Sequence, residues 1–202
     1  THTLYRHLVK TLGDTYARRM VSAEKLVSDY RSRHVASEIV AFGEAGELSR
    51  NIAERALSNE VITPGKTTLA EVAWWMWDQL LARGLGSSFD MPSVYITGPD
   101  GIEATSNERI IQRGDLLIID WGVGYLNFWT DVKRMAYVLK ETERAVPPGF
   151  QRAFDQAAKV RDLIRRTIRP GGTAKDMLDR LNAGIAALPG FAVMRGFNQP
   201  NA

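Results

Sequence analysis

The feature that most constrains the fold is a short segment that occurs twice. Residues 62–67 (ITPGKT) match residues 168–173 (IRPGGT) at an offset of 106 positions. Proline and glycine end one helix and a following threonine begins the next, so each copy predicts a helix, a tight turn and a second helix. We interpret the match as a duplicated helix–helix–strand unit. The alternative is that Pro-Gly turns are simply common between helices.

Apolar periodicity predicts the helices of the first copy. An apolar residue recurs every three or four positions over 35–57, which indicates a long amphipathic helix that stops near the turn at 62–65. Thr68 and Glu71 have the spacing of a capping box, so a second helix is expected to begin there. That helix should break at Gly84, because glycine is the usual residue beyond a helix end.

The second copy and the N-terminal segment are also predicted to be helical. Residues 150–167 carry another apolar period, and a further helix should begin at Thr173. Residues 1–34 form a polar helical lead-in with Ser22 as an N-cap, and we expect this lead-in to join a further N-terminal region.

Between the helical segments the pattern changes to strands. Residues 94–96 predict a short strand, 116–120 a buried apolar strand and 127–139 a long second strand. The connection at 121–126 contains two glycines, which predicts a β-hairpin. The second copy should continue into strands from about residue 195, with its partner hairpin beyond Ala202. We therefore expect a chain that is incomplete at both ends.

Composition excludes several classes of protein. With 45% hydrophobic and 24% charged residues over 202 positions, the chain can bury a core and is not disordered. The formal charge of +3 is small and scattered, which argues against nucleic acid as a partner. The apolar runs are too short to cross a bilayer. The absence of cysteine removes disulfides, thiolate metal sites and cysteine nucleophiles.

Two aspartates are the candidate metal ligands. Asp120 ends the apolar strand and Asp131 lies within the aromatic-rich strand, so the two side chains can face each other across the hairpin. Carboxylates held close together repel unless a proton or a cation lies between them, and hard divalent cations take such oxygens. The pair therefore predicts a metal site. The alternative is that Asp120 is a turn or cap residue and that Asp131 pairs with Lys133 or Arg134.

The surrounding residues resemble the metal-binding hairpin of the pita-bread metallohydrolases, the superfamily of methionine aminopeptidase, Xaa-Pro aminopeptidase and creatinase. The family pattern is Gly-Asp, an apolar strand, Asp-x-Gly, and a second Asp eleven residues after the first in a Ser/Thr-Asp-x-x-Arg context. Residues 114–122 (GDLLIIDWG) and 130–134 (TDVKR) match it. Residues 97–99 (TGP) and the two Pro-Gly-x-Thr segments also fit, and Xaa-Pro aminopeptidase-like members are the most similar branch.

The resemblance implies a fold, a cofactor and an activity. The fold would be the α+β pita-bread fold of pseudo-duplicated helix-helix-strand units, with a first repeat over 35–140 and an incomplete second repeat over 149–202. Asp120 would bind one divalent metal and Asp131 would bridge two, the ions being Mn, Co, Fe or Zn. A bridging hydroxide would cleave the N-terminal residue from a peptide. Residues 35–202 would then form an incomplete catalytic domain.

Two departures from the family keep other functions open. The family completes its site with one His and two Glu from its second half, which this sequence does not provide, so the catalytic residues are unknown. The family also has a His between the Gly-Pro turn and the Gly-Asp strand, whereas 100–113 contain Glu103, Thr105 and Ser106 but no His. His34 precedes the motif and is expected to be a surface or packing residue. The alternatives are a creatinase-like hydrolase of another C–N bond and an inactive binding module.

The remaining expectations concern partners and location. We expect a peptide or small amide substrate, a homodimer, no nucleic-acid or membrane partner, and a cytoplasmic location. Trp74, Trp75 and Trp77 share one predicted helix and cannot all face the core. Either one or two of them meet another domain or subunit, or they pack within the chain.

Overall fold

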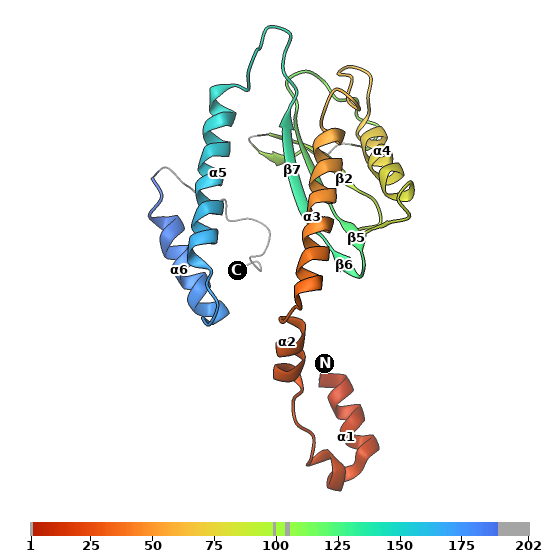
Figure 1. The fold of residues 1–202 in the computed structure, drawn as a ribbon, viewed down its shortest axis with the longest axis vertical. Helices are drawn as coiled ribbons and strands as arrows, with labels where there is room; N and C mark the ends of the chain where they lie inside the picture. Colours follow the sequence, from red (N-terminus) through yellow and green to blue (C-terminus); the bar gives the residue numbers. More distant parts are fainter. Residues whose placement is uncertain (1, 99, 104–105, 190–202) are drawn as a thin grey trace. The chain divides into compact units, whose positions relative to one another are not determined.

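The computed structural model describes residues 2–98, 100–103 and 106–189 (Figure 1). The chain divides into two compact units. The first comprises the described residues up to Ile111 together with Leu116–Ala136, and the second comprises Gln112–Asp115 with the described residues from Tyr137 onward. Within the described ranges, no helix is both long enough and apolar enough to span a bilayer.

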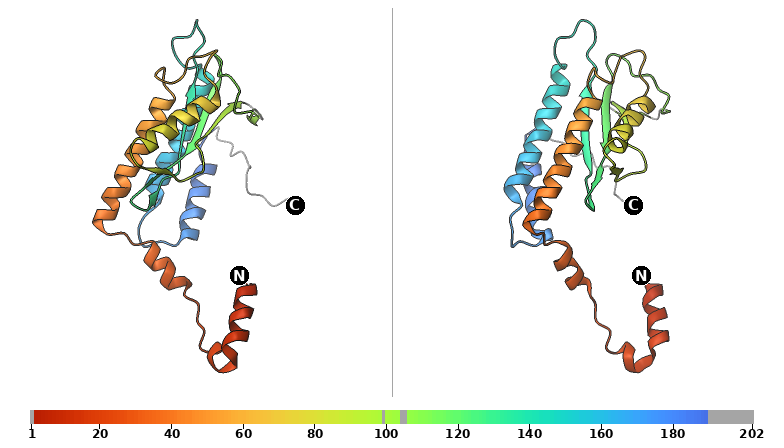
Figure 2. Two further views of the ribbon diagram at one scale, coloured as in Figure 1. Left: turned by 90° about the vertical axis from the view of Figure 1, so that its right-hand side faces the viewer. Right: turned by 45° about the vertical axis from the view of Figure 1, so that its right-hand side comes forward.

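Helices α3 (Ala36–Ala56) and α4 (Leu69–Leu81) form the helical layer of the first unit, as the periodicity predicts. The two helices pack on each other. In addition, α3 packs against β5 (Val123–Tyr125), and α4 packs against β2 (Ser93–Gly98). Figure 2 shows this unit from two further sides. Helix α3 ends before the predicted stop, because the Ser58 hydroxyl donates to the Arg55 carbonyl and accepts from Glu60 N.

The start of α4 confirms the predicted capping box. The backbone N–H of Thr68 donates to Glu71 Oε2 at 2.7 Å, and Glu71 N donates to Thr68 Oγ1 at 3.1 Å. Two of the amide groups that a helix start leaves without partners are thereby satisfied. The helix ends at Leu81, and Gly84 follows with a φ of +66°.

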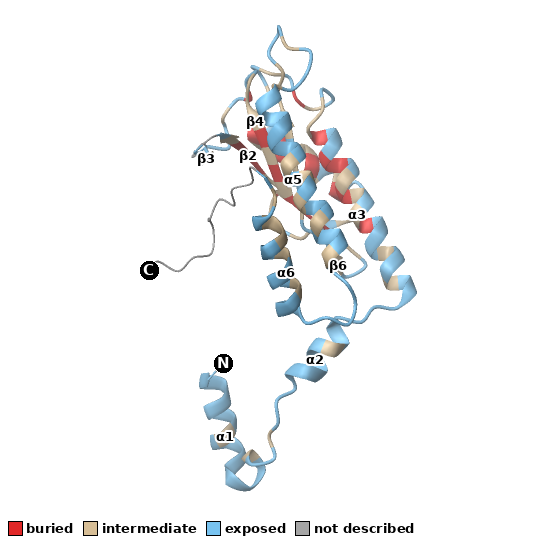
Figure 3. Cartoon of the chain, turned by 90° about the vertical axis from the view of Figure 1, so that its left-hand side faces the viewer, coloured by how far each residue is buried: buried red, intermediate tan, exposed pale blue. Residues whose placement is uncertain are grey.

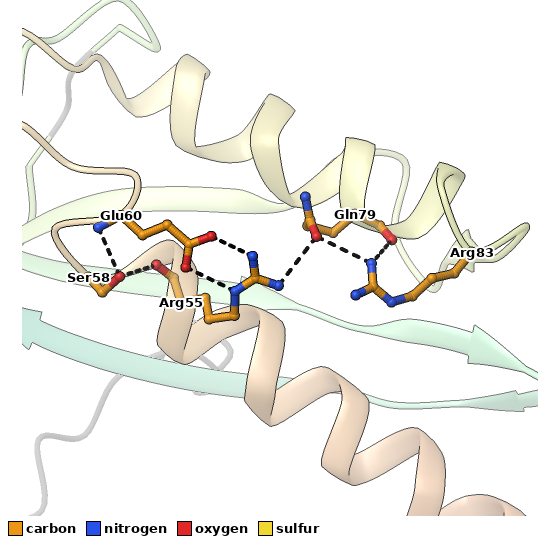
Figure 4. Close-up of polar contacts among 5 residues, drawn as sticks. All are labelled: Arg55, Ser58, Glu60, Gln79 and Arg83. Atoms are coloured by element: carbon orange, nitrogen blue, oxygen red, sulfur yellow. Dashed lines mark hydrogen bonds and ion pairs between the residues drawn. The ribbon is translucent and has the colours of Figure 1, made fainter.

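A polar cluster joins the end of α3 to α4 (Figure 4). The Arg55 guanidinium pairs with Glu60, and its hydrogen bond lowers the pKa of the Glu60 carboxyl. Gln79 Oε1 accepts from Arg55 at 3.5 Å and from Arg83 at 3.2 Å, so it bridges the two cations. Arg55 also lies 5.0 Å from the centre of the Trp75 ring. Trp75 therefore packs within the chain, whereas Trp74 is 57% exposed.

The predicted strands lie in two sheets, in which β2 pairs antiparallel with β3 (Gly101–Ile102) and β4 (Leu116–Trp121). A four-stranded sheet runs β3, β2, β4, β7 (Val132–Tyr137), with Ser93 opposite Asp120 and Thr97 opposite Leu116. A three-stranded sheet runs β1 (Gly86–Ser87), β5, β6 (Phe128–Trp129). Buried residues lie on α3 and along the strands (Figure 3).

The single long strand predicted over 127–139 is wrong. It divides at Thr130-Asp131 into β6 and β7, and the turn lies at Leu126-Asn127, where φ is +48° and +64°. Two left-handed residues between paired strands form the turn type that suits the twist of a hairpin. The glycines of 121–126 are not in this turn. A Cβ on Gly122 would overlap the Thr130 carbonyl, so this glycine permits a close backbone approach.

The lead-in is helical, as predicted. Helices α1 (His2–Ala17) and α2 (Glu24–Arg31) contain no buried residue. The N-cap of α2 is Ala23 rather than the predicted Ser22, although Ser22 Oγ accepts from Glu24 N at 3.2 Å.

The second unit contains the predicted helices α5 (Pro148–Thr167) and α6 (Ala174–Ala186), which pack on each other. Gly65 and Gly171 both have left-handed backbones, with φ of +80° and +90°, so the glycine of the Pro-Gly turn has the same handedness in both copies. The capping threonine is Thr173 here and Thr68 in the first copy, one position out of register with the repeat. The strands expected from about residue 195 lie outside the described residues.

Candidate metal centre

Strand alternation places Asp120 on the half-exposed face of β4. Leu117, Ile119 and Trp121 are fully buried, so the residues between them point to the opposite face. The Asp120 side chain is 30% exposed there. A carboxylate at this position keeps access to solvent and to a cation, while the strand that carries it is fixed by burial on its other side.

Thr130 fixes the backbone that presents Asp131. It is 5% exposed, and its N–H donates to the Val123 carbonyl at 3.0 Å. Its hydroxyl accepts from Val123 N at 2.8 Å and shares a hydrogen bond of 2.6 Å with Ser49 Oγ from α3. Asp131 follows immediately, with its side chain 69% exposed. The break between β6 and β7 is therefore anchored on both the strand side and the helix side.

The Thr130 carbonyl explains the glycine of the Asp-x-Gly pattern. Ser88 Oγ donates to this carbonyl at 2.7 Å, and the carbonyl lies against Gly122 where any side chain would collide with it. Sequence reasoning assigned no role to Ser49 or Ser88, and it assigned Gly122 to a hairpin turn that lies instead at Leu126-Asn127. The spacing of the motif indicated the glycine, but nothing in the sequence indicated the two serines.

The Gly-Asp pair at the start of the motif shapes the entry to β4. Gly114 has a φ of +96° and its N–H donates to the Val138 carbonyl at 2.7 Å. Asp115 Oδ2 accepts from Gln112 N at 2.7 Å, and Asp115 O accepts from Val138 N at 2.9 Å. Asp115 therefore stabilises a turn, whereas Asp120 is a candidate metal ligand.

Lys133 brings the two candidate ligands together. Its Nζ donates to Asp120 Oδ1 at 2.9 Å and lies 3.5 Å from Asp131 Oδ1. The hydrogen bond to Asp120 raises the pKa of the Lys133 ammonium. Both carboxylates thus surround one positive charge. The ion pair foreseen between Asp131 and Lys133 is present, and the assignment of Asp120 and Asp131 as metal ligands stays a prediction.

The donor chemistry of this pair fits a divalent cation. Two carboxylate oxygens already gathered on a cation are the hard ligands that Mn, Fe, Co and Zn accept. In the part of the chain that the structure describes, no group of three or more His, Asp or Glu side chains forms a fuller metal site. Asp120 and Asp131 therefore fit as two ligands of a metal centre.

The segment without histidine has structural contacts. Glu103 N donates to the Ile96 carbonyl at 2.8 Å, and Glu103 Oε1 lies 3.9 Å from Arg109 Nε. The Ser106 carbonyl accepts from Arg109 N at 3.0 Å, while Thr105 lies outside the described residues. The His34 side chain is half-exposed, and its ring centre lies 6.5 Å from that of Phe128. This is a packing contact, as expected for a surface or packing residue.

Comparison with known proteins gives a family and a set of structural neighbours. Residues 41–198 match the sequence model of metallopeptidase family M24. A search of curated protein sequences finds no match for the chain.

Solved structures of aminopeptidases and prolidases are similar to this chain. An X-Pro aminopeptidase from Thermotoga maritima aligns at 20% identity with a TM-score of 0.65, over 92% of this chain and 50% of that chain. A prolidase from Pyrococcus horikoshii aligns at 23% identity and 0.59, over 81% and 45%. Zn-substituted aminopeptidase P from Escherichia coli aligns at 19% identity and 0.63, over 80% and 36%. The chain spans half or less of each neighbour, and identities this low show a shared fold alone.

Proposed function

The chain belongs to metallopeptidase family M24, and from this membership we propose that the protein is a divalent-metal-dependent hydrolase. The predicted resemblance and the predicted α+β pita-bread fold are thereby confirmed. In its finer form, the proposal is an Xaa-Pro aminopeptidase-like activity that removes the N-terminal residue of a peptide. The neighbours named X-Pro aminopeptidase and aminopeptidase P support this form.

The observation that carries the proposal is the convergence of Asp120 and Asp131 on one cation. Their Oδ1 atoms lie 2.9 and 3.5 Å from Lys133 Nζ, although Asp120 lies in β4 and Asp131 lies just before β7. A structural ion pair needs one carboxylate for one ammonium. The second carboxylate adds repulsion that a divalent cation would offset more fully than a lysine does.

The residues around the site would have distinct roles in holding the metal. Asp120 and Asp131 would hold one or two ions of Mn, Co, Fe or Zn. When bound, the metal supplies a Lewis acid that polarises the scissile carbonyl and lowers the pKa of a nucleophilic water. Thr130, held by Ser49, keeps the Asp131 backbone in place so that both carboxylates meet on one face. The buried side of β4 fixes the other carboxylate.

Peptide hydrolysis by metal-loaded protein tests the proposal. The apoprotein is loaded with Mn²⁺, and release of the first residue is followed on an Ala-Pro-Ala peptide and on an Ala-Ala-Ala peptide. We expect cleavage of the proline peptide and a loss of at least about 100-fold in kcat/KM for Asp120→Asn and Asp131→Asn, because the charge on a ligand is removed while its shape is kept. Light scattering on the same samples tests the proposed homodimer.

Matched controls separate the site from general charge effects. Asp162→Asn removes an exposed carboxylate of α5 and should leave both activity and bound metal unchanged. Bound metal is measured by elemental analysis after gel filtration. If Asp120→Asn and Asp131→Asn retain the wild-type metal content, these residues are not the ligands.

A second candidate is favoured by the absence of His in 100–113. In the resemblance that position acts on a peptide substrate, so a chain without it fits hydrolysis of another small C–N substrate, as in creatinase. Creatine is therefore included in the assay. Turnover of creatine without peptide cleavage supports the second candidate, and metal binding without any turnover supports a binding module.

A further inference from the structure

The lysine between the two carboxylates has an unusual position. Lys133 lies in β7, and Asp131 immediately precedes that strand. Its Nζ contacts Asp120 at 2.9 Å and Asp131 at 3.5 Å, and its side chain is 60% exposed. The ammonium is therefore at the point where the two acidic side chains meet, and it is reached from solvent.

We propose that Lys133 is an internal cation of the Asp120–Asp131 pair, which competes with divalent metal for the two carboxylates and leaves them when metal binds. The inference rests on the proposed function, because it requires these aspartates to be metal ligands. It goes further by giving the metal-free state a defined structure and by naming the residue that sets metal affinity.

Electrostatics make the two cations mutually exclusive. A divalent ion held by Asp120 and Asp131 would compete with the ammonium for the same oxygens, and a double and a single positive charge held that close repel each other even in water-like surroundings. The lysine has room to leave. Its flexible four-carbon stem is mostly exposed, so the ammonium can turn to solvent without unpacking the sheet.

The neighbouring cation does not take over this role. Arg134 Nη1 donates to the carbonyl of Lys133 at 2.9 Å, which engages that guanidinium with the backbone. The stability of the metal-free pair therefore depends on Lys133. Removal of this side chain leaves two carboxylates with less positive charge between them and a greater affinity for a divalent ion.

Calorimetric titration with MnCl₂ tests the competition. The wild type is compared with Lys133→Met, which keeps much of the stem but removes the charge, and with Lys133→Arg, which keeps the charge. We expect Lys133→Met to bind Mn²⁺ roughly 10-fold more tightly than wild type and Lys133→Arg to bind like wild type. Lys159→Met, which removes an exposed charge from α5, should leave the affinity unchanged.

A second measurement follows the lysine itself. Amine-reactive labelling with peptide mass analysis should show Lys133 labelled faster after Mn²⁺ is added, because its ammonium is released from two acceptors. Labelling of Lys159 should stay the same. A labelling rate of Lys133 that is unchanged or lower in the metal-bound protein overturns the proposal.

The outcomes distinguish this inference from the proposed function. Equal or weaker binding by Lys133→Met, with metal-dependent activity in the wild type, overturns the inference and leaves the function standing. Binding by Lys133→Met but not by wild type supports the inference and removes the proposed metal dependence of the wild type. Binding by neither protein overturns both.

Discussion

The two helix pairs of this chain share local chemistry and differ in burial. The pair α3–α4 and the pair α5–α6 are each joined by a Pro-Gly turn with a left-handed glycine and a threonine N-cap. In α3 and α4 several side chains are buried, among them Ile52, Met76 and Leu80. In α5 and α6, as far as the structure describes their surroundings, no residue is buried.

This difference shows that the local interactions that form a helix are distinct from the packing interactions that form a core. Caps and turns act over a few residues, so both copies have a left-handed glycine in the turn and a threonine N-cap on the second helix. Burial requires a second layer, which the strands β2 and β5 supply for the first pair. Stability should therefore depend on individual side chains much more in the first pair than in the second.

The sharpest test of the comparison is one substitution made in both pairs. Leu80→Ala removes a side chain that is 1% exposed and should lower the free energy of unfolding by about 2–5 kcal/mol. Leu178→Ala removes one that is 56% exposed and should cost about 0.5 kcal/mol or less. Urea unfolding followed by circular dichroism measures both. Equal losses would mean that α6 is covered in solution.

Removing one side-chain hydrogen bond from each helix pair makes the same comparison, with a smaller expected loss of stability. Ser49→Ala removes the buried hydrogen bond to Thr130 and should destabilise the protein by about 1–3 kcal/mol. Gln151→Ala removes an exposed hydrogen bond to Asp155 in α5 and should have no measurable effect. Thermal melts of the two variants compare them directly. A loss confined to Gln151→Ala would reverse the assignment of the buried layer.

The smallest expected difference lies at the caps, where the two pairs should behave alike. Thr68→Ala and Thr173→Ala each remove a hydroxyl that accepts a backbone N–H at 3.1 Å. Each should cost about 1 kcal/mol, because capping depends on local geometry and little on burial. Substitution by Ser should restore most of the loss. If only Thr68→Ala is destabilising, α6 contributes nothing to the unfolding transition.

Local signals in the sequence predicted the helices well. The apolar period located α3, the Thr68–Glu71 pair located the start of α4, and Thr173 located the start of α6. Each of these signals acts within a few residues, which is why it can be read without the rest of the fold. The end of α3 was misplaced because a serine, not the Pro-Gly turn, ends it.

The arrangement around the aspartates was only partly predictable. The strand pattern together with the family resemblance predicted both candidate ligands, but the strand break at Thr130 depends on contacts with distant residues. The turn at Leu126-Asn127 was missed because leucine rarely adopts a positive φ, so the glycines nearby were the more obvious choice. The sequence indicates Lys133 as a partner of Asp131, but its contact with Asp120 depends on how the strands pair.

The hydrogen bond between Ser49 and Thr130 also has an entropic consequence. The two residues are 81 positions apart, whereas α3 and α4 are joined by a short connection. The free-energy cost of closing a loop rises by about 0.6 kcal/mol for each doubling of the loop length. Closing the loop between Ser49 and Thr130 therefore costs about 2 kcal/mol more than closing the short connection between α3 and α4. The two aspartates are near neighbours in sequence, but the position of the second depends on one of the longest-range contacts in the first unit.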